Sequence, residues 1–315
     1  MEDHTKFPSW IIKAEESKKD KFKSNPSNFF KKALECYPNF HSIYINCPKT
    51  SKLGILNTYD LSILEKYYEE SSLREFIIFN IFETFHFLYV YQIREIAIAM
   101  HEALEHGAFY TAVILNRSIF ESVCIQYYTF RRIEENFEQS LKYIGTASKT
   151  KSKLEQDKLH DKYIESLYDV FSLLHRANSA SSINWALHLK QLGYEIENAQ
   201  PSNRIHINDA IEDIEKASKL PLIKSYNLMS EFVHPNYGAK TLVINSKHPH
   251  NNCMDVLVIG DNAENTEAAL FYIEQLSESL YYTLTLACSL HDKSAKFMEK
   301  CDKYLSYLAD KRNLH

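Results

Sequence analysis

The stretch AFYTAVILNRSIFESVCIQYYTF, residues 108–130, decides the fold class of this chain. Its residues are apolar on nearly every face of a helix, which is typical of a helix at the centre of a bundle. Arg117 and Glu121 are the two charged residues within it, and their spacing of four places them on one face. Since a buried charge is costly unless it is paired, the two residues either form a structural ion pair or line a polar pocket where Arg117 binds an anionic group.

Working outward from this stretch, the rest of the chain also favours helices. The sequence has only 6 glycines and 8 prolines in 315 residues, and these residues supply most turn signals. A lysine-rich hinge is expected at 146–163, and two β-branched runs, 240–246 and 253–260, predict one hairpin. We therefore predict an all-α, multi-helix bundle of at least six helices with one small β-hairpin near residues 240–260. The helical segments are expected at about 60–106, 108–144, 164–176, 183–193, 208–220, 222–234 and 263–309.

Two regions are expected along the chain. Residues 1–57 contain four of the eight prolines and predict an N-terminal extension of short helices, packed on the main body or trailing from it. Residues 58–315 are predicted to form a single helical domain in which the hairpin is an insertion. The longest apolar segment, 76–93, is interrupted by Asn80, Glu83 and His86, so we expect a core helix rather than a membrane span.

Composition limits the compartment and the partners. The N-terminus lacks an apolar segment of signal-peptide length, and the six cysteines show no CxxC or paired spacing, which favours the reducing cytoplasm. The net charge of −5 argues against a broad basic surface for nucleic acids, although it leaves a small local site open.

A second segment that carries candidate residues is YNLMSEFVHPNYG, residues 226–238. Ser230 and His234 are four apart and share a face at the end of a helix, because Pro235 stops the helix. Asn236 can turn back to bond the free carbonyl groups. His234 can titrate near neutral pH and serve as acid, base or anion donor, or it can be a structural cap at the corner before the hairpin.

A metal site is a further alternative. Glu83-x-x-His86 and Glu231-x-x-His234 have the spacing found in di-iron carboxylate bundles, where Glu121 could supply a bridging carboxylate. Acidic residues and histidines are numerous enough in this chain that such matches arise by chance, so we predict neither a metal nor a cofactor.

Three of these segments together resemble a group of bacterial helical proteins of uncharacterised function that are placed near the HEPN superfamily. They are AVILNRSIFESVCIQYY, INWALHL and SYNLMSEFVHPNYG, and the resemblance covers about residues 90–260. HEPN proteins often occur in toxin–antitoxin, abortive-infection and antiphage loci. Their ribonuclease signature is an arginine followed by four to six residues and a histidine, which Arg94 and His101 match. No arginine precedes His234 at that spacing.

The resemblance implies a HEPN-like effector or toxin of an antiphage or abortive-infection system that acts on RNA or a nucleotide. His234 would be the general acid or base and Arg117 the phosphate clamp, with Glu121, Ser230 and Asn236 completing the site. Independently of the resemblance, the two helices that carry these residues are apolar enough to be neighbours in one bundle, where packed helices are about 8–10 Å apart. We therefore predict that the side chains of Arg117, Glu121 and His234 lie within about 8 Å of one another around a cavity.

The chain could be a non-catalytic interaction or ligand-sensing module in which the same residues are structural. Arg94 and His101 are the secondary catalytic candidates. The predicted partners are RNA or a nucleotide, a protein from the same operon, or a second copy of the chain in a homodimer, and no membrane.

Overall fold

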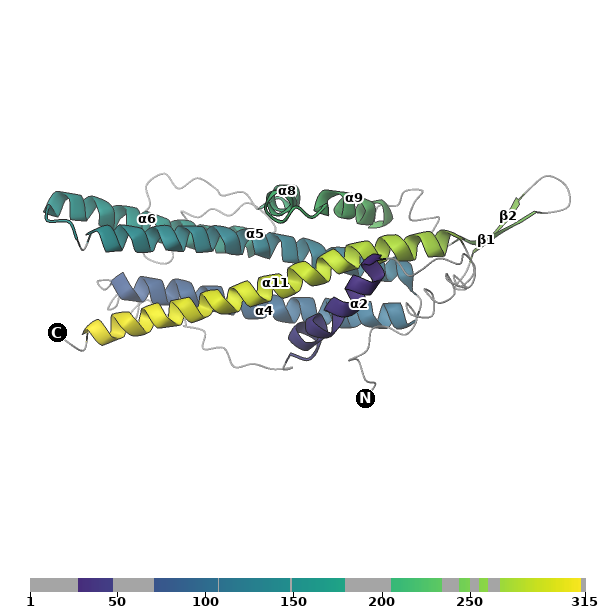
Figure 1. Cartoon of the computed structure of the whole chain (residues 1–315), viewed down its shortest axis with the longest axis horizontal. Helices are drawn as coiled ribbons and strands as arrows, with labels where there is room; N and C mark the ends of the chain where they lie inside the picture. The colour runs from purple at the N-terminus through teal and green to yellow at the C-terminus, as the bar shows by residue number, and fades with distance from the viewer. Residues whose placement is uncertain are drawn as a thin grey trace. The chain divides into compact units, whose positions relative to one another are not determined.

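A computed structural model of the chain describes residues 28–47, 71–106, 108–147, 149–178, 205–233, 244–249, 255–259 and 267–312 (Figure 1). Most of these residues are helical, which confirms the predicted predominantly helical class. The described part contains more than six helices. They are α2 (Asn28–Phe40), the short π-helix η1 (His41–Ile45), α4 (Ser71–Glu105), α5 (Phe109–Ala147), α6 (Lys153–Asn178), α8 (Ile207–Ser218), α9 (Leu222–Val233) and α11 (Glu267–Arg312).

Two short strands lie between α9 and α11. Strand β1 (Ile244–Pro249) pairs antiparallel with β2 (Asp255–Ile259), from Ile244 opposite Ile259 to Pro249 opposite Asp255. The register is irregular between Ile244 and Ser246. Pro249 stands at the end of its strand, where the missing backbone N–H disturbs the ladder least.

Helix boundaries differ from the predicted ones in two places. The prediction that α5 ends at Gly145 is wrong, because the helix continues to Ala147. Gly145 is exposed, with open space around the position of a Cβ atom, so a helical glycine costs only about 1 kcal/mol relative to alanine there. Most of the predicted hinge at 146–163 belongs to α6, which begins at Lys153, since its Lys, Glu, Gln and Leu residues are good helix formers.

Backbone contacts divide the chain into two compact units. The first comprises residues 1–49, 90–124 and 211–291, and the second comprises 50–89, 125–210 and 292–315. The predicted boundary at residue 57 lies outside the described residues, as does the predicted helix at 183–193.

In the first unit, α2 and η1 pack on α11. The ring of Phe29 meets that of Tyr282 edge-on at 5.7 Å, and the Tyr44 hydroxyl donates to the backbone oxygen of Ala287 at 2.8 Å. Residues 28–47 therefore contribute to the core of this unit.

In the second unit, α5 and α11 run side by side in the same direction. Phe297 is 1% exposed and packs edge-on against Phe130 and Phe137, with both pairs of ring centroids 5.5 Å apart. Lys300 extends this contact to the surface, where its Nζ lies 3.4 Å from Glu134.

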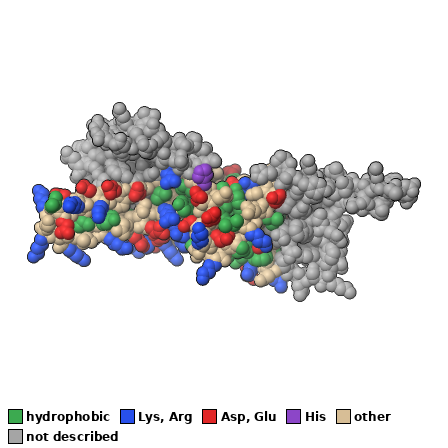
Figure 2. All heavy atoms as spheres, turned by 90° about the horizontal axis from the view of Figure 1, so that it is seen from above, with side chains coloured by type: hydrophobic (Ala, Val, Ile, Leu, Met, Phe, Trp, Pro, Cys, Tyr) green, Lys and Arg blue, Asp and Glu red, His purple; other side chains and the backbone are tan. Residues whose placement is uncertain are grey.

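Two properties of the described helices are relevant to the predicted partners. On the face drawn in Figure 2, basic and acidic side chains are interspersed along the described helices. Among the described residues, no helix combines the length and the apolar character needed to cross a lipid bilayer.

The stretch that decided the fold class is central, as predicted. Every side chain from Ala112 to Phe130 is buried or half-buried, and Thr111 is the first exposed one before it. Helix α5 therefore carries Arg117 and Glu121 into the interior of the first unit.

Candidate functional site

The candidate site lies where α9 packs on α5 in the first unit. Asn116 on α5 donates from Nδ2 to the Met229 sulfur of α9 at 3.4 Å and to the Ser279 hydroxyl of α11 at 3.1 Å. Arg117 donates from Nη2 to the Tyr226 hydroxyl of α9 at 3.1 Å. These contacts confirm that the helix containing Arg117 and the helix leading to His234 are neighbours.

The turn from α8 into α9 sets the position of Tyr226. Lys219 follows α8 with a φ of 59°, a left-handed conformation that ends helices, and its N–H donates to the Glu215 carbonyl at 2.8 Å. The Glu215 carboxylate then accepts the backbone N–H of Ile223 at 2.7 Å, which satisfies a free donor in the first turn of α9. Leu222 and Met229 are buried and hold the inner face of α9 in the unit.

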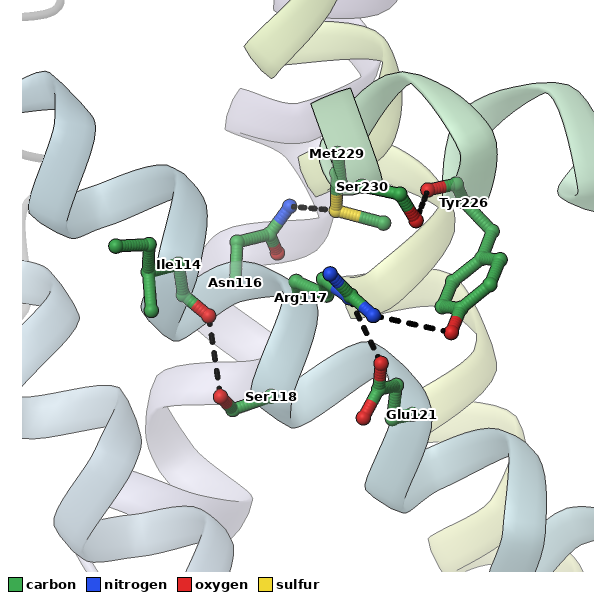
Figure 3. A network of polar contacts seen from close by, with 8 residues as sticks. All are labelled: Ile114, Asn116, Arg117, Ser118, Glu121, Tyr226, Met229 and Ser230. Carbon is green, nitrogen blue, oxygen red and sulfur yellow. Dashed lines mark hydrogen bonds and ion pairs between the residues drawn. The ribbon is translucent and has the colours of Figure 1, made fainter. Parts of the chain in front are cut away.

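Arg117 is held on two sides (Figure 3). Its Nε donates to Glu121 Oε1 at 2.7 Å, and its Cζ lies 5.0 Å from the centre of the Tyr226 ring. The Tyr226 ring stacks in turn on Phe120, with centroids 6.3 Å apart and planes 20° apart. The Arg117 side chain is only 14% exposed, and its Nη1 is buried with no hydrogen-bond partner among the described residues. The guanidinium is therefore oriented, with one nitrogen left over for a further acceptor.

The contacts of Arg117 and Tyr226 shift the pKa values of both side chains. Burial lowers the pKa of Arg117, but the hydrogen bonds and charge interactions with Tyr226 and Glu121 together raise it by more. The net pKa is therefore raised, and the guanidinium stays protonated. Burial, followed by the charge of Glu121, raises the pKa of Tyr226 despite the opposing effect of Arg117. At neutral pH the site thus contains a cation and a neutral phenol beside the Glu121 carboxyl, which is 36% exposed.

The other residues predicted on α9 are only partly described. Ser230 donates its hydroxyl to the Tyr226 carbonyl at 2.8 Å, so this hydroxyl bonds its own helix. His234 and Asn236 lie outside the described residues, because α9 is described to Val233. Arg117 and Glu121 are in contact as expected, and the predicted convergence of His234 with them stays a prediction.

The secondary candidates on α4 have separate partners. His101 is buried at 6% exposure, where it hydrogen-bonds and stacks with Tyr37 of α2, with ring centroids 6.0 Å apart. Arg94 is 13% exposed and pairs with its neighbour Glu95. These contacts fit a histidine at the edge of the core.

The described residues contain no group of three His, Cys, Asp or Glu side chains that could hold a metal ion. The side chain of Glu83 and the whole of His234, two members of the di-iron alternative, lie outside the described residues.

Two residues of the site were not singled out in the sequence. Tyr226 is the partner of Arg117, and its signal is its position four residues before Ser230, on the same face of α9. Asn116 is fully buried beside Arg117, and its signal is a polar amide within an apolar run.

Comparison of the chain with protein-family models, with curated proteins and with solved structures finds no match.

Proposed function

We propose that this chain is a HEPN-like effector or toxin of a bacterial antiphage or abortive-infection system, located in the cytoplasm, that binds a phosphate of RNA or of a nucleotide at Arg117. The observation that carries the proposal is the hydrogen bonding of the Arg117 guanidinium. Glu121 and Tyr226 hold Nε and Nη2, while Nη1 is buried without a partner among the described residues. Arginine N–H groups bind phosphate oxygens with strong, charge-assisted hydrogen bonds.

In this proposal the phosphate binds first and the chemistry follows at the end of α9. Arg117 clamps one phosphate oxygen, and Glu121 and Tyr226 prevent the guanidinium from turning away. His234, one residue beyond α9, acts as general acid or base, because its ordinary pKa is near 6.5. Ser230 holds this last turn of α9 through its bond to the Tyr226 carbonyl.

The test is inducible expression in bacteria, with growth, phage plaque counts and the integrity of cellular RNA as readouts. Arg117→Gln and His234→Ala are expected to abolish growth arrest or phage protection. Arg132→Gln is the matched control, because Arg132 is an exposed arginine of α5 that pairs with Glu135. Unchanged melting temperatures must accompany the loss, and wild-type phenotypes in both site variants would refute the proposal.

A second candidate function is a non-catalytic interaction or ligand-sensing module. The observation in its favour is that Arg117 and Glu121 compensate each other's charge while Arg117 joins α5 to α9 through Tyr226. In that case His234→Ala leaves the phenotype intact, and Arg117→Gln lowers the melting temperature.

A further inference from the structure

The charge balance around Arg117 limits the kind of phosphate that can bind there. Arg117 and Glu121 are the two charged residues of α5 within the first unit, and their charged groups lie 2.7 Å apart. The pair is therefore neutral as a whole. Tyr226 adds no charge while its hydroxyl is protonated.

The neighbouring helix α9 adds no net positive charge to the site. The one basic residue of α9 is Lys224, which is 73% exposed and lies 4.0 Å from Glu278 of α11. Glu231 is the one acidic residue of α9 and is exposed. Among the described residues of α5 and α9 in this unit, each cation is thus matched by a carboxylate.

We infer that Glu121 lowers the affinity of the site for a doubly charged terminal phosphate more than for a singly charged phosphodiester, and so biases the site towards the diester. This inference rests on the proposed function, in which Arg117 binds a phosphate, and it assigns Glu121 the role of a specificity-determining residue. The shared ligand chemistry is a phosphodiester, whether it comes from an RNA linkage or from an esterified nucleotide.

The physical reason is the range of the charge interaction. The guanidinium is one small planar group, so an oxyanion bound at Nη1 lies closer to the Glu121 carboxylate than about 8 Å, the Debye length at physiological ionic strength. A terminal phosphate carries nearly two charges at pH 7, because its second pKa is about 6, whereas a diester carries one. By Coulomb's law at this range and in a partly exposed setting, the repulsion from Glu121 costs the extra charge about threefold to tenfold in affinity and so offsets part of the attraction of Arg117.

Glu121→Gln separates charge from geometry. The amide oxygen of glutamine can still accept the hydrogen bond from Arg117 Nε, while the negative charge is removed. The variant is expected to bind a terminal phosphate about threefold to tenfold more tightly than the wild type. Its affinity for a diester rises less, because the diester has one charge, so the ratio of the two affinities moves towards the terminal phosphate.

The experiment is calorimetric titration of the full chain with adenosine 5′-monophosphate and with its methyl ester, which differ in one charge. A tetra-adenylate without terminal phosphates is the RNA arm. If the ester binds and the tetra-adenylate does not, the source is a nucleotide, and tight binding of the tetra-adenylate assigns RNA. Glu135→Gln is the matched control, since Glu135 pairs with Arg131 and Arg132 on the surface of α5 in the second unit.

Acidification gives a second readout. At pH 5.5 much of the monophosphate is singly charged, so the effect of Glu121→Gln on its affinity is expected to shrink towards the effect seen with the ester. A ratio of monophosphate to ester affinity at pH 7.5 that is the same in the wild type and in Glu121→Gln overturns the inference and leaves the proposed function standing. Binding of neither compound, or binding that Arg117→Gln leaves intact, overturns both.

Discussion

The Arg117 guanidinium donates a hydrogen bond to the hydroxyl of Tyr226 at 3.1 Å, across 109 positions of the chain. The same guanidinium lies 5.0 Å from the centre of the Tyr226 ring, so one residue of α9 holds Arg117 through both its hydroxyl and its ring. Tyr226 therefore supports Arg117 in two separable ways.

Tyr226→Phe removes the hydroxyl and keeps the ring. The free energy of unfolding is expected to fall by about 1–2 kcal/mol, because a hydrogen bond to a charged group is lost while the stacking on Phe120 remains. Urea denaturation followed by circular dichroism measures this change. Tyr110→Phe on α5 is the control, with an expected change below about 0.5 kcal/mol. A Tyr226→Phe protein as stable as the wild type would show that the bond contributes nothing.

Asn116→Ala tests the junction of α5, α9 and α11. Asn116 is fully buried and bonds Ser279 of α11 at 3.1 Å, so truncation removes this bond and leaves a cavity. The expected loss in the free energy of unfolding is about 2–3 kcal/mol, measured by urea denaturation. Ser118→Ala is the matched control, because Ser118 bonds only to Ile114 of its own helix in Figure 3. Losses of equal size in the two variants would contradict this role for Asn116.

How far the fold and the site could be predicted depends on the range of the interactions. The central position of α5 follows from the periodicity of residues 108–130, and the Arg117–Glu121 contact follows from the geometry of one helix turn. The contact between Arg117 and Tyr226 depends on how two helices distant in sequence pack, and no local pattern encodes that packing. The same holds for Tyr37 and His101, which stack across 64 positions.

Helix boundaries were less predictable for a different reason. A glycine stops a helix only where a left-handed residue or a close contact is needed, and Gly145 meets neither condition inside α5. By contrast, Lys219 adopts the left-handed conformation after α8 although it has a side chain. Glu215 bonds both Lys219 and Ile223, and these contacts hold the turn.

Gly145→Ala is expected to stabilise the second unit. The position is helical, and a Cβ atom there meets nothing within 4 Å. Alanine lowers the conformational entropy of the unfolded chain, so the free energy of unfolding should rise by about 0.5–1 kcal/mol. Differential scanning calorimetry measures the rise in melting temperature. A lower melting temperature would mean that the backbone at residue 145 is not helical in solution.

The final prediction concerns alkaline pH and Tyr282. Burial, followed by the charge of Glu278, raises the pKa of Tyr282 to about 12, and its hydroxyl donates to Glu278 at 3.3 Å. The ordinary pKa of tyrosine is about 10, so between about pH 10 and 12 the folded chain retains a proton that the unfolded chain has lost. The contribution of Tyr282 is therefore complete below pH 10, and stability falls as the pH rises from 10 towards 12.

Tyr282→Phe removes this titration. The free energy of unfolding of the wild type should decrease more steeply than that of the variant above pH 10, by at most about 1.4 kcal/mol per pH unit for one group. Urea denaturation at half-unit pH intervals from 8 to 11.5 measures both slopes. The remaining slope of the variant belongs to other groups such as Tyr37 and Cys124, whose pKa values are also raised by burial. Parallel curves for the two proteins above pH 10 would show that the Tyr282 hydroxyl titrates equally in the folded and unfolded chain, and the buried bond to Glu278 would then have to be abandoned.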